Sequence, residues 1–286
     1  MIWGLSFVAQ KSGSGTIDSF TFNATRFAIG TLVLLPVLAL KNRKPSEDGL
    51  PAPSKKTYVI AGICCGFCLF AGTALQQEAF TYLEAGKVGF VTALYMILVP
   101  VFGLFIGKKA GINAWVGVVL GAVGLYLICI KPGKASLGKG DIITIIGAVC
   151  FALHILCVDR FVTKVDALKL STLQFFVAFI FSAVAMAIFE KPTLEAIRSA
   201  WVPIIYCGVM SSGVAFTFQT YGQKYTEPAI ASLLLCLESA FSLLFGWLIL
   251  HENLGKRALI GCAVMMVAVI LTQIDFKTFR KNKEGA

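Results

Sequence analysis

The chain is dominated by long apolar runs, which are separated by short segments that contain charged residues, proline or glycine. A helix needs about 20 mainly apolar residues to cross the hydrocarbon core of a bilayer, and each of these runs has that length. The apolar and polar alternation of a transmembrane β-barrel is absent. The pattern therefore predicts membrane helices, which satisfy their own backbone groups where no water is available. The predicted spans cover 19–40, 57–80, 86–107, 114–130, 141–162, 169–189, 200–221, 228–250 and 257–274.

The two halves of the chain resemble each other. Residues 75–84 align with 218–227, and at the same offset Phe102 aligns with Phe245. The repeated unit has five helices, and an odd number of helices places the two copies in opposite orientations. Such inverted repeats are common in secondary transporters, whose substrate site lies near the midplane. The predicted domains are a first repeat at 1–131, a linker at 132–140, a second repeat at 141–276 and a basic cytoplasmic tail at 277–286.

The opening segment, residues 1–11, is apolar but too short to be a complete span. As a helix it would rise only about 16 Å, and it lacks the basic start and the cleavage site of a signal peptide. Its counterpart in the second repeat extends upstream to Asp141. We therefore expect an all-α integral membrane protein of about ten transmembrane helices, with the first helix truncated by about six to ten residues ahead of Met1.

Composition agrees with a membrane protein, because 57% of the residues are hydrophobic and only 14% are charged, against roughly 25% charged in soluble domains. The net charge of +10 does not indicate nucleic-acid binding, since the basic residues lie in short loops rather than on one face. Placing the loop 41–56 in the cytoplasm puts most basic loop residues on that side. This predicts a multi-pass protein of the cell membrane with both termini cytoplasmic.

The sequence predicts neither a cofactor nor a metal. None of the nine cysteines lies in a loop; Cys65 and Cys68 have metal-binding spacing, but inside an apolar helix packing is the favoured interpretation. The chain has no phosphate-binding loop for ATP, so a gradient must drive any transport, with protons as a candidate coupling ion. His154 and His251 lie on different helices, which argues against an enzyme. An integral-membrane enzyme and a receptor without transport are the alternatives.

One segment resembles a known family. Residues 231–246, ASLLLCLESAFSLLFG, resemble the ninth-helix signature of EamA-type members of the drug/metabolite transporter superfamily. Residues 3–7 and 25–27 resemble that family's first-helix and second-helix motifs, and the resemblance covers essentially the whole chain. It implies a ten-helix permease that exports or imports small metabolites such as amino acids. Ser239 departs from the family, which usually has proline there, and this puts a kink of the ninth helix in doubt.

Ionisable groups inside membrane spans are costly to bury, so each is a functional hypothesis. Glu238 lies in the middle of its span and suits proton coupling or the binding of a substrate amine; a structural carboxyl group is the alternative. His154 could carry a proton near neutral pH, although a histidine bonded to a facing helix is favoured. Arg26 could bind an anion, but extension of its side chain to the membrane surface is favoured.

The other candidates are polar residues, several of them at repeat-related positions. Gln76 and Gln219 form such a pair, and Tyr95, the repeat equivalent of Glu238, is expected to oppose it across a cavity. For the glutamines the alternative is a place at the interface where their helices end, and for Tyr95, Thr92, Ser211 and Ser212 it is core packing. The candidates for substrate binding or coupling are Glu238, Gln76, Gln219, Tyr95, Thr92, His154, Ser211, Ser212, Arg26 and Gln10.

Small residues on helix faces indicate close packing. Ser239, Ser242 and Gly246 share one face, and Gly62 and Gly66 have GxxxG spacing. Packing within one chain explains both patterns, so monomer and homodimer remain open. The expected partners are a small-molecule substrate and the lipid bilayer, with no nucleic acid.

Overall fold

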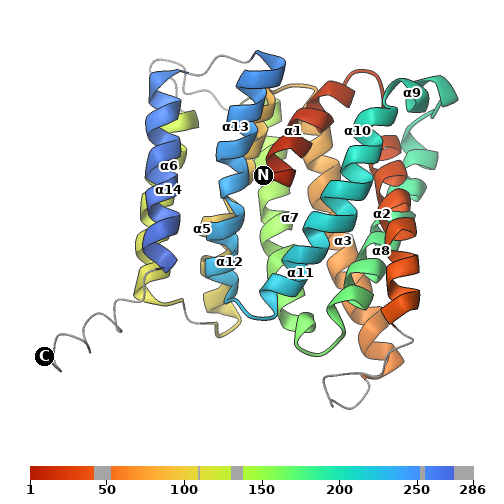
Figure 1. The fold of residues 1–286 in the computed structure, drawn as a ribbon, viewed down its shortest axis with the longest axis horizontal. Helices are drawn as coiled ribbons and strands as arrows, with labels where there is room; N and C mark the ends of the chain where they lie inside the picture. Colours follow the sequence, from red (N-terminus) through yellow and green to blue (C-terminus); the bar gives the residue numbers. More distant parts are fainter. Residues whose placement is uncertain (42–52, 109, 130–137, 252–254, 274–286) are drawn as a thin grey trace, which may run out of the picture.

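The computed structural model describes residues 1–41, 53–108, 110–129, 138–251 and 255–273. In this part of the chain the helices stand side by side in one bundle, with α6 and α14 at one edge and α2 and α8 at the other (Figure 1). The described residues form no β-sheet. Most of the predicted linker, the loop residues 42–52 and the predicted basic tail lie outside the described residues.

Seven helical segments of the described residues are long and apolar enough to cross a membrane. Two further apolar helices, α6 and α14, pack against each other, and α1 has 12 residues. The prediction of about ten spans in two inverted repeats remains a prediction. The helices are α1 (Ile2–Gly13), α2 (Ser19–Lys41), α3 (Lys55–Ala79), α4 (Ala85–Thr92), α5 (Tyr95–Phe105), α6 (Ile112–Cys129), α7 (Lys139–Val162), α8 (Ala167–Phe189), α9 (Leu194–Ser199), α10 (Trp201–Tyr206), the π-helix η1 (Cys207–Phe216), α11 (Thr217–Gln223), α12 (Pro228–Leu235), α13 (Leu237–Leu250) and α14 (Lys256–Gln273).

Three predicted spans are interrupted. The helices α4 and α5 are separated at 93–94, where the N–H of Leu94 bonds to the carbonyl of Val91, three residues back. A similar tight turn at Cys236 separates α12 from α13, and there the N–H of Ser239 donates to Cys236 at 3.0 Å. The third span contains η1. The interruption at Cys236 forms although proline is absent at Ser239, and irregular turns of this kind often mark functional sites.

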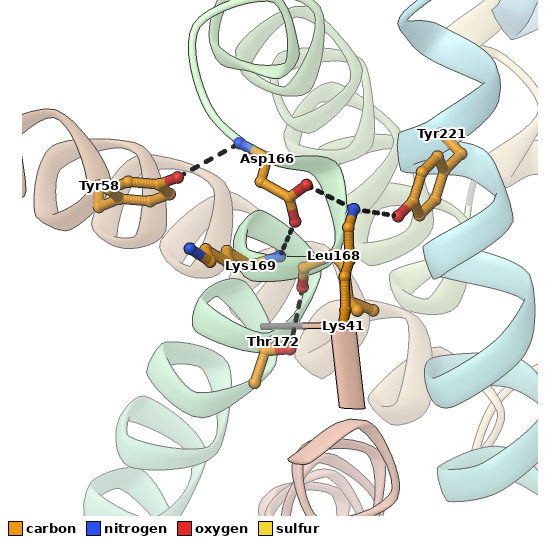
Figure 2. Close-up of polar contacts among 7 residues, drawn as sticks. All are labelled: Lys41, Tyr58, Asp166, Leu168, Lys169, Thr172 and Tyr221. Carbon is orange, nitrogen blue, oxygen red and sulfur yellow. Dashed lines mark hydrogen bonds and ion pairs between the residues drawn. The ribbon is translucent and has the colours of Figure 1, made fainter. Parts of the chain in front are cut away.

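The helices α2 and α8 form an antiparallel pair that is held at both ends. At the start of α2, the carboxylate of Glu190 accepts hydrogen bonds from the N–H groups of Phe20 and Thr21, both at 2.7 Å. These donors are unpaired within the helix, so a carboxylate stabilises them. At the other end, Lys41 forms an ion pair of 2.6 Å with Asp166, which also caps α8 (Figure 2).

Two further ion pairs connect the first half, residues 1–131, to the second half, residues 141–276. Lys87 of α4 pairs with Asp141 at 2.7 Å, and Lys108 beyond α5 pairs with Asp159 at 2.8 Å. Both aspartates belong to α7 and lie near its opposite ends. In each of these three ion pairs, including that of Lys41 with Asp166, the lysine comes from the first half and the aspartate from the second.

Small residues allow the helices to approach closely within the chain. A Cβ atom added to Gly66 of α3 would lie 2.6 Å from Cβ of Val177 in α8. Gly4 of α1 and Gly89 of α4 both pack against Ser242 of α13. The packing interpretation of the GxxxG pattern and of the face around Ser242 is therefore confirmed.

Candidate substrate site

A polar cavity lies beside the interruptions of α4–α5 and α12–α13, and α1, α2, α3, α7, η1 and α11 complete its walls. Glu238 is near the middle of the segment Pro228–Leu250, so the cavity is deep within the bundle. The space within it that the centre of a water molecule can occupy is about 40 Å³. The predicted candidates that line it are Glu238, Gln76, Gln219, Tyr95, Thr92, His154, Ser211, Arg26 and Gln10.

Tyr95 and Glu238 meet directly. The hydroxyl of Tyr95 donates to Oε1 of Glu238 at 2.9 Å, which joins residues 143 positions apart in the sequence. Tyr95 is the first residue of α5, and Glu238 lies in the first turn of α13.

Arg26 of α2 is buried in the wall of the cavity, with a side-chain exposure of 1%. Its Nη1 donates to Oε1 of Gln10 at 3.0 Å, and its guanidinium carbon lies 5.0 Å from the centre of the Phe27 ring. Gln10 is oriented in turn by Ser6, to which its amide nitrogen donates. The expectation that Arg26 extends to the membrane surface is therefore wrong, because Gln10 holds it inside the bundle.

His154 of α7 is bonded to a facing helix, as the favoured interpretation held. Its Nε2 donates to Oε1 of Gln174 in α8 at 2.9 Å, and Gln174 donates to Thr220 of α11 at 3.5 Å. The imidazole also packs edge-on against Phe216. Because Nε2 is used as a donor, Nδ1 is the nitrogen left to accept a hydrogen bond or a proton.

The repeat-related glutamines both line the cavity, but they make different contacts. Gln76 donates to the hydroxyl of Thr92 at 3.2 Å. Gln219 donates to Gln223 at 3.0 Å, one turn further along α11. The two amides are therefore held by neighbours in their own halves, and both line the same cavity.

Ser212 is the one candidate that the structure does not bring to the cavity. It is fully buried and packs against Gly30 of α2. Sequence reasoning also missed the aromatic part of the wall, which includes Trp3, Phe151 and Phe216. The ring of Trp3 packs edge-on against Phe216 at 4.8 Å. No signal in the sequence separated these rings from the many aromatic residues that face outward.

A larger apolar groove of about 470 Å³ adjoins the cavity. It runs between the start of α1 and the helices α11, α12 and α13, and its lining is mainly apolar. The groove and the cavity share Trp3, Gln219, Leu235 and Glu238. Glu238 thus borders both spaces.

The cavity offers one cation, one acid, a histidine and several amide and hydroxyl groups, set among aromatic rings. This combination can bind a small solute that has both polar and apolar parts, since apolar walls with a few placed polar groups are typical of small-molecule sites.

Comparison with known proteins agrees with a transporter. An uncharacterized transporter of Archaeoglobus fulgidus is 27% identical over 275 residues, which cover 96% of this chain and 83% of that protein. The uncharacterized transporter YoaV of Bacillus subtilis is 22% identical and covers 96% and 94%. A WAT1-related protein of Arabidopsis thaliana is 23% identical and covers 94% and 85%.

The fold also recurs in a solved crystal structure, with a TM-score of 0.72 over 94% of both chains at 19% sequence identity. The sequence model of the EamA-like transporter family matches residues 1–130 and again residues 138–274. These matches account for nearly the whole chain. The protein is therefore a membrane transporter that belongs to the EamA-like transporter family, within the drug/metabolite transporter superfamily.

Proposed function

We propose that the protein is a secondary transporter that moves small metabolites, such as amino acids or related amphipathic solutes, by alternating access through the cavity. The observation that carries this proposal is the hydrogen bond of 2.9 Å between Tyr95 and Glu238. It joins the two halves beside both helix interruptions, and interrupted helices at the interface of two repeats are the usual substrate sites of secondary transporters.

The size of the cavity supports a mechanism that requires movement of the walls. A water molecule needs roughly 10–15 Å³ on this measure, so the volume of about 40 Å³ admits only a few waters. A metabolite therefore enters after the two halves separate on one side.

The ion pairs between the halves supply a reason for two alternative open states. Lys87 and Asp141 hold one end of α7, while Lys108 and Asp159 hold the other. Opening at either end breaks the pair at that end and leaves the opposite pair intact. We further propose that the halves are inverted repeats, that the protein lies in the cell membrane and that both termini are cytoplasmic.

Glu238 is the residue we assign to coupling. It is partly buried, it borders both the cavity and the adjoining groove, and its described side-chain partner is Tyr95. A proton or a substrate amine that arrives at Glu238 competes with the tyrosine hydroxyl. The loss of that hydrogen bond then loosens the contact between the halves.

The test is flux into proteoliposomes with a panel of labelled amino acids, amines and sugar phosphates, with and without a proton gradient. Wild type is compared with Glu238→Gln, which keeps the size of the side chain and removes its charge. We expect saturable flux in wild type that follows the gradient, and loss of this coupling in the variant. Flux that survives both changes would mean a facilitator with a structural Glu238. Specific binding without flux of any solute would instead favour a receptor.

A further inference from the structure

Arg26 has fewer partners than a buried guanidinium requires. This group carries five N–H donors and a permanent charge, yet its exposure is 1%. The described residues give it one hydrogen-bond acceptor, Oε1 of Gln10 at 3.0 Å, and contact with the face of Phe27. Its Nε is buried and has no hydrogen-bond partner within the described part of the chain.

Arg26 also lacks a counter-ion. The ion pairs of the described residues all use lysines, and none includes Arg26. The acid that lines the same cavity, Glu238, receives its hydrogen bond from Tyr95. A buried charge is normally paired, because its removal from water is strongly unfavourable. The missing anion is therefore expected from outside the chain, and the cavity is where it can arrive.

The chemistry of the wall favours a carboxylate over a phosphate. A guanidinium binds either anion through two parallel N–H groups. Within the described lining, Arg26 is the only Arg or Lys, and Glu238 is the only Asp or Glu. One cation opposite one acid suits an anion with a single charge, whereas a doubly charged phosphate would lack a second cation. The rings of Phe151 and Phe216 supply an apolar surface beside it.

We infer that Arg26 binds the carboxylate group of the transported solute, so that the substrates are small amphipathic carboxylates, including zwitterions whose amine faces Glu238. This inference rests on the proposed transport function, because the solute is taken to occupy the cavity. Gln10 is the positioning residue, since it holds the guanidinium through Nη1, whereas Nε has no hydrogen-bond partner among the described residues. A purely structural Arg26 would contribute to folding but would not distinguish a carboxylate from an uncharged group of the same shape.

The experiment measures binding separately from flux. The protein is reconstituted in lipid nanodiscs, and Kd is obtained from ligand-dependent shifts in the midpoint of thermal unfolding. The probes are two matched pairs: phenylalanine with phenylalaninamide, and 3-phenylpropionate with 3-phenylpropionamide. Each pair differs by replacement of the carboxylate with a neutral amide. The decisive quantity is the ratio of amide Kd to acid Kd.

Wild type is expected to bind each acid about tenfold or more tightly than its amide, as the loss of a charge-assisted hydrogen bond implies. Arg26→Gln is expected to remove this preference. Arg26→Lys keeps the charge but not the paired donors, so its ratio of amide Kd to acid Kd should be lower than that of wild type by about threefold or more. This variant provides the test if Arg26→Gln does not fold. Arg198→Gln, the same substitution at an exposed arginine of α9, is the control and should leave the ratio unchanged.

A second variant separates the two ends of the solute. Glu238→Gln should weaken the binding of phenylalanine, which has an amine, and leave the acid preference of 3-phenylpropionate intact. Equal binding of acids and amides by wild type, no binding of any acid, or an unchanged ratio in folded Arg26 variants would each overturn the inference. An Arg26-dependent preference without flux under any gradient would preserve the carboxylate site and refute transport. Flux of acids, together with a ratio of amide Kd to acid Kd that the Arg26 substitutions do not change, would preserve transport and refute the carboxylate site.

Discussion

At the scale of single residues, Glu238 and Tyr95 depend on the interruptions that precede them. Each lies at the beginning of a new helix, so its side chain projects from the point where the regular hydrogen bonding of the span is broken. The two tight turns thus lie directly beside the hydrogen bond that joins the halves.

Tyr95→Phe removes one hydroxyl group and leaves the ring. Glu238 would then lose its described side-chain partner, and a hydrogen bond to a charged group contributes about 1.5–3 kcal/mol. We expect the rate of gradient-driven flux to fall by roughly tenfold or more, while the amount of folded protein stays similar. Tyr225→Phe is the matched control, because the Tyr225 side chain is 80% exposed. Equal flux in wild type and Tyr95→Phe would show that the hydrogen bond has no part in transport.

At the scale of helices, the contact between α3 and α8 depends on the absence of a side chain. Gly66 lies so close to α8 that an added Cβ would meet Val177 at 2.6 Å and the carbonyl oxygen of Gln174 at 2.9 Å. The second of these is a backbone atom, which a rotamer change cannot move away. The packing of these two helices is therefore intolerant of even one methyl group.

Gly66→Ala is expected to lower the free energy of unfolding by about 1–3 kcal/mol, the usual penalty for overpacking a close contact. Gly222→Ala is the control on another helix, because a Cβ there meets nothing within 4 Å. Alanine is the better helix former, so this control should be neutral or slightly stabilising. Thermal unfolding in detergent micelles measures both. A Gly66→Ala midpoint at or above the wild-type value would contradict the close packing.

The ends of α2 and α8 add a contribution to stability that depends on pH. Burial alone would raise the pKa of Asp166, but hydrogen bonds from Lys41 and from the N–H of Lys169, together with the charge of Lys41, outweigh burial and lower this pKa. A carboxyl group with a lowered pKa stabilises the fold above its unfolded value of about 3.9. That stability is lost as the pH falls through the lowered pKa.

Lys41→Gln should therefore lower the midpoint of thermal unfolding at neutral pH, and its difference from wild type should shrink as the pH falls below about 3.9 and through the lowered pKa of Asp166. The effect should be small, up to about 1 kcal/mol, because the pair is partly exposed. Lys164→Gln, at an exposed lysine near the start of α8, is the control. A difference between Lys41→Gln and wild type that is the same at every pH would exclude the ion pair as its cause.

The polar part of the cavity could be predicted from the sequence because polar groups avoid lipid. Glu238, Gln76 and His154 each stand in an apolar span, and the cost of exposure to hydrocarbon directs such groups inward. Ser212 does not line the cavity, because a small hydroxyl residue next to glycine can equally pack at a contact between two helices. Aromatic residues give no such signal: Phe216 in the cavity and Phe218 on the outer surface are both apolar, and lipid and protein interior are equally apolar.

The interruptions of the spans were also beyond sequence reasoning. The turn between α4 and α5 contains Ala93 and Leu94, and that before α13 contains Cys236. None of these is glycine or proline, so no local signal predicts a break. The tertiary contacts of the bundle stabilise turns that the local sequence does not require. The doubt about a kink near Ser239 arose from reliance on proline alone.

At the scale of the whole molecule, α7 is attached to the first half at both of its ends. The pair of Lys87 with Asp141 and the pair of Lys108 with Asp159 lie at opposite ends of the bundle. An alternating mechanism requires that only one end be open at a time, and two competing contacts on one rigid helix provide such a balance. Each pair favours the states in which its own end is closed.

Asp141→Asn and Asp159→Asn should therefore shift the transporter in opposite directions. Each removes a contact worth up to about 1 kcal/mol, and favours the state open at its own end by roughly fivefold. The measurement is the apparent KM from each side of oriented proteoliposomes. The ratio of the two values should rise in one variant and fall in the other. A shift in the same direction for both would contradict the assignment of the pairs to opposite gates.

The direction of the charges has a consequence for assembly. Because the described ion pairs take lysine from the first half and aspartate from the second, two copies of the same half would lack one partner of each of these pairs. A mixed pairing restores all three. If the halves were made as separate polypeptides, these pairs would favour the association of unlike halves over that of like halves. Charge selects between homodimers and heterodimers in the same way.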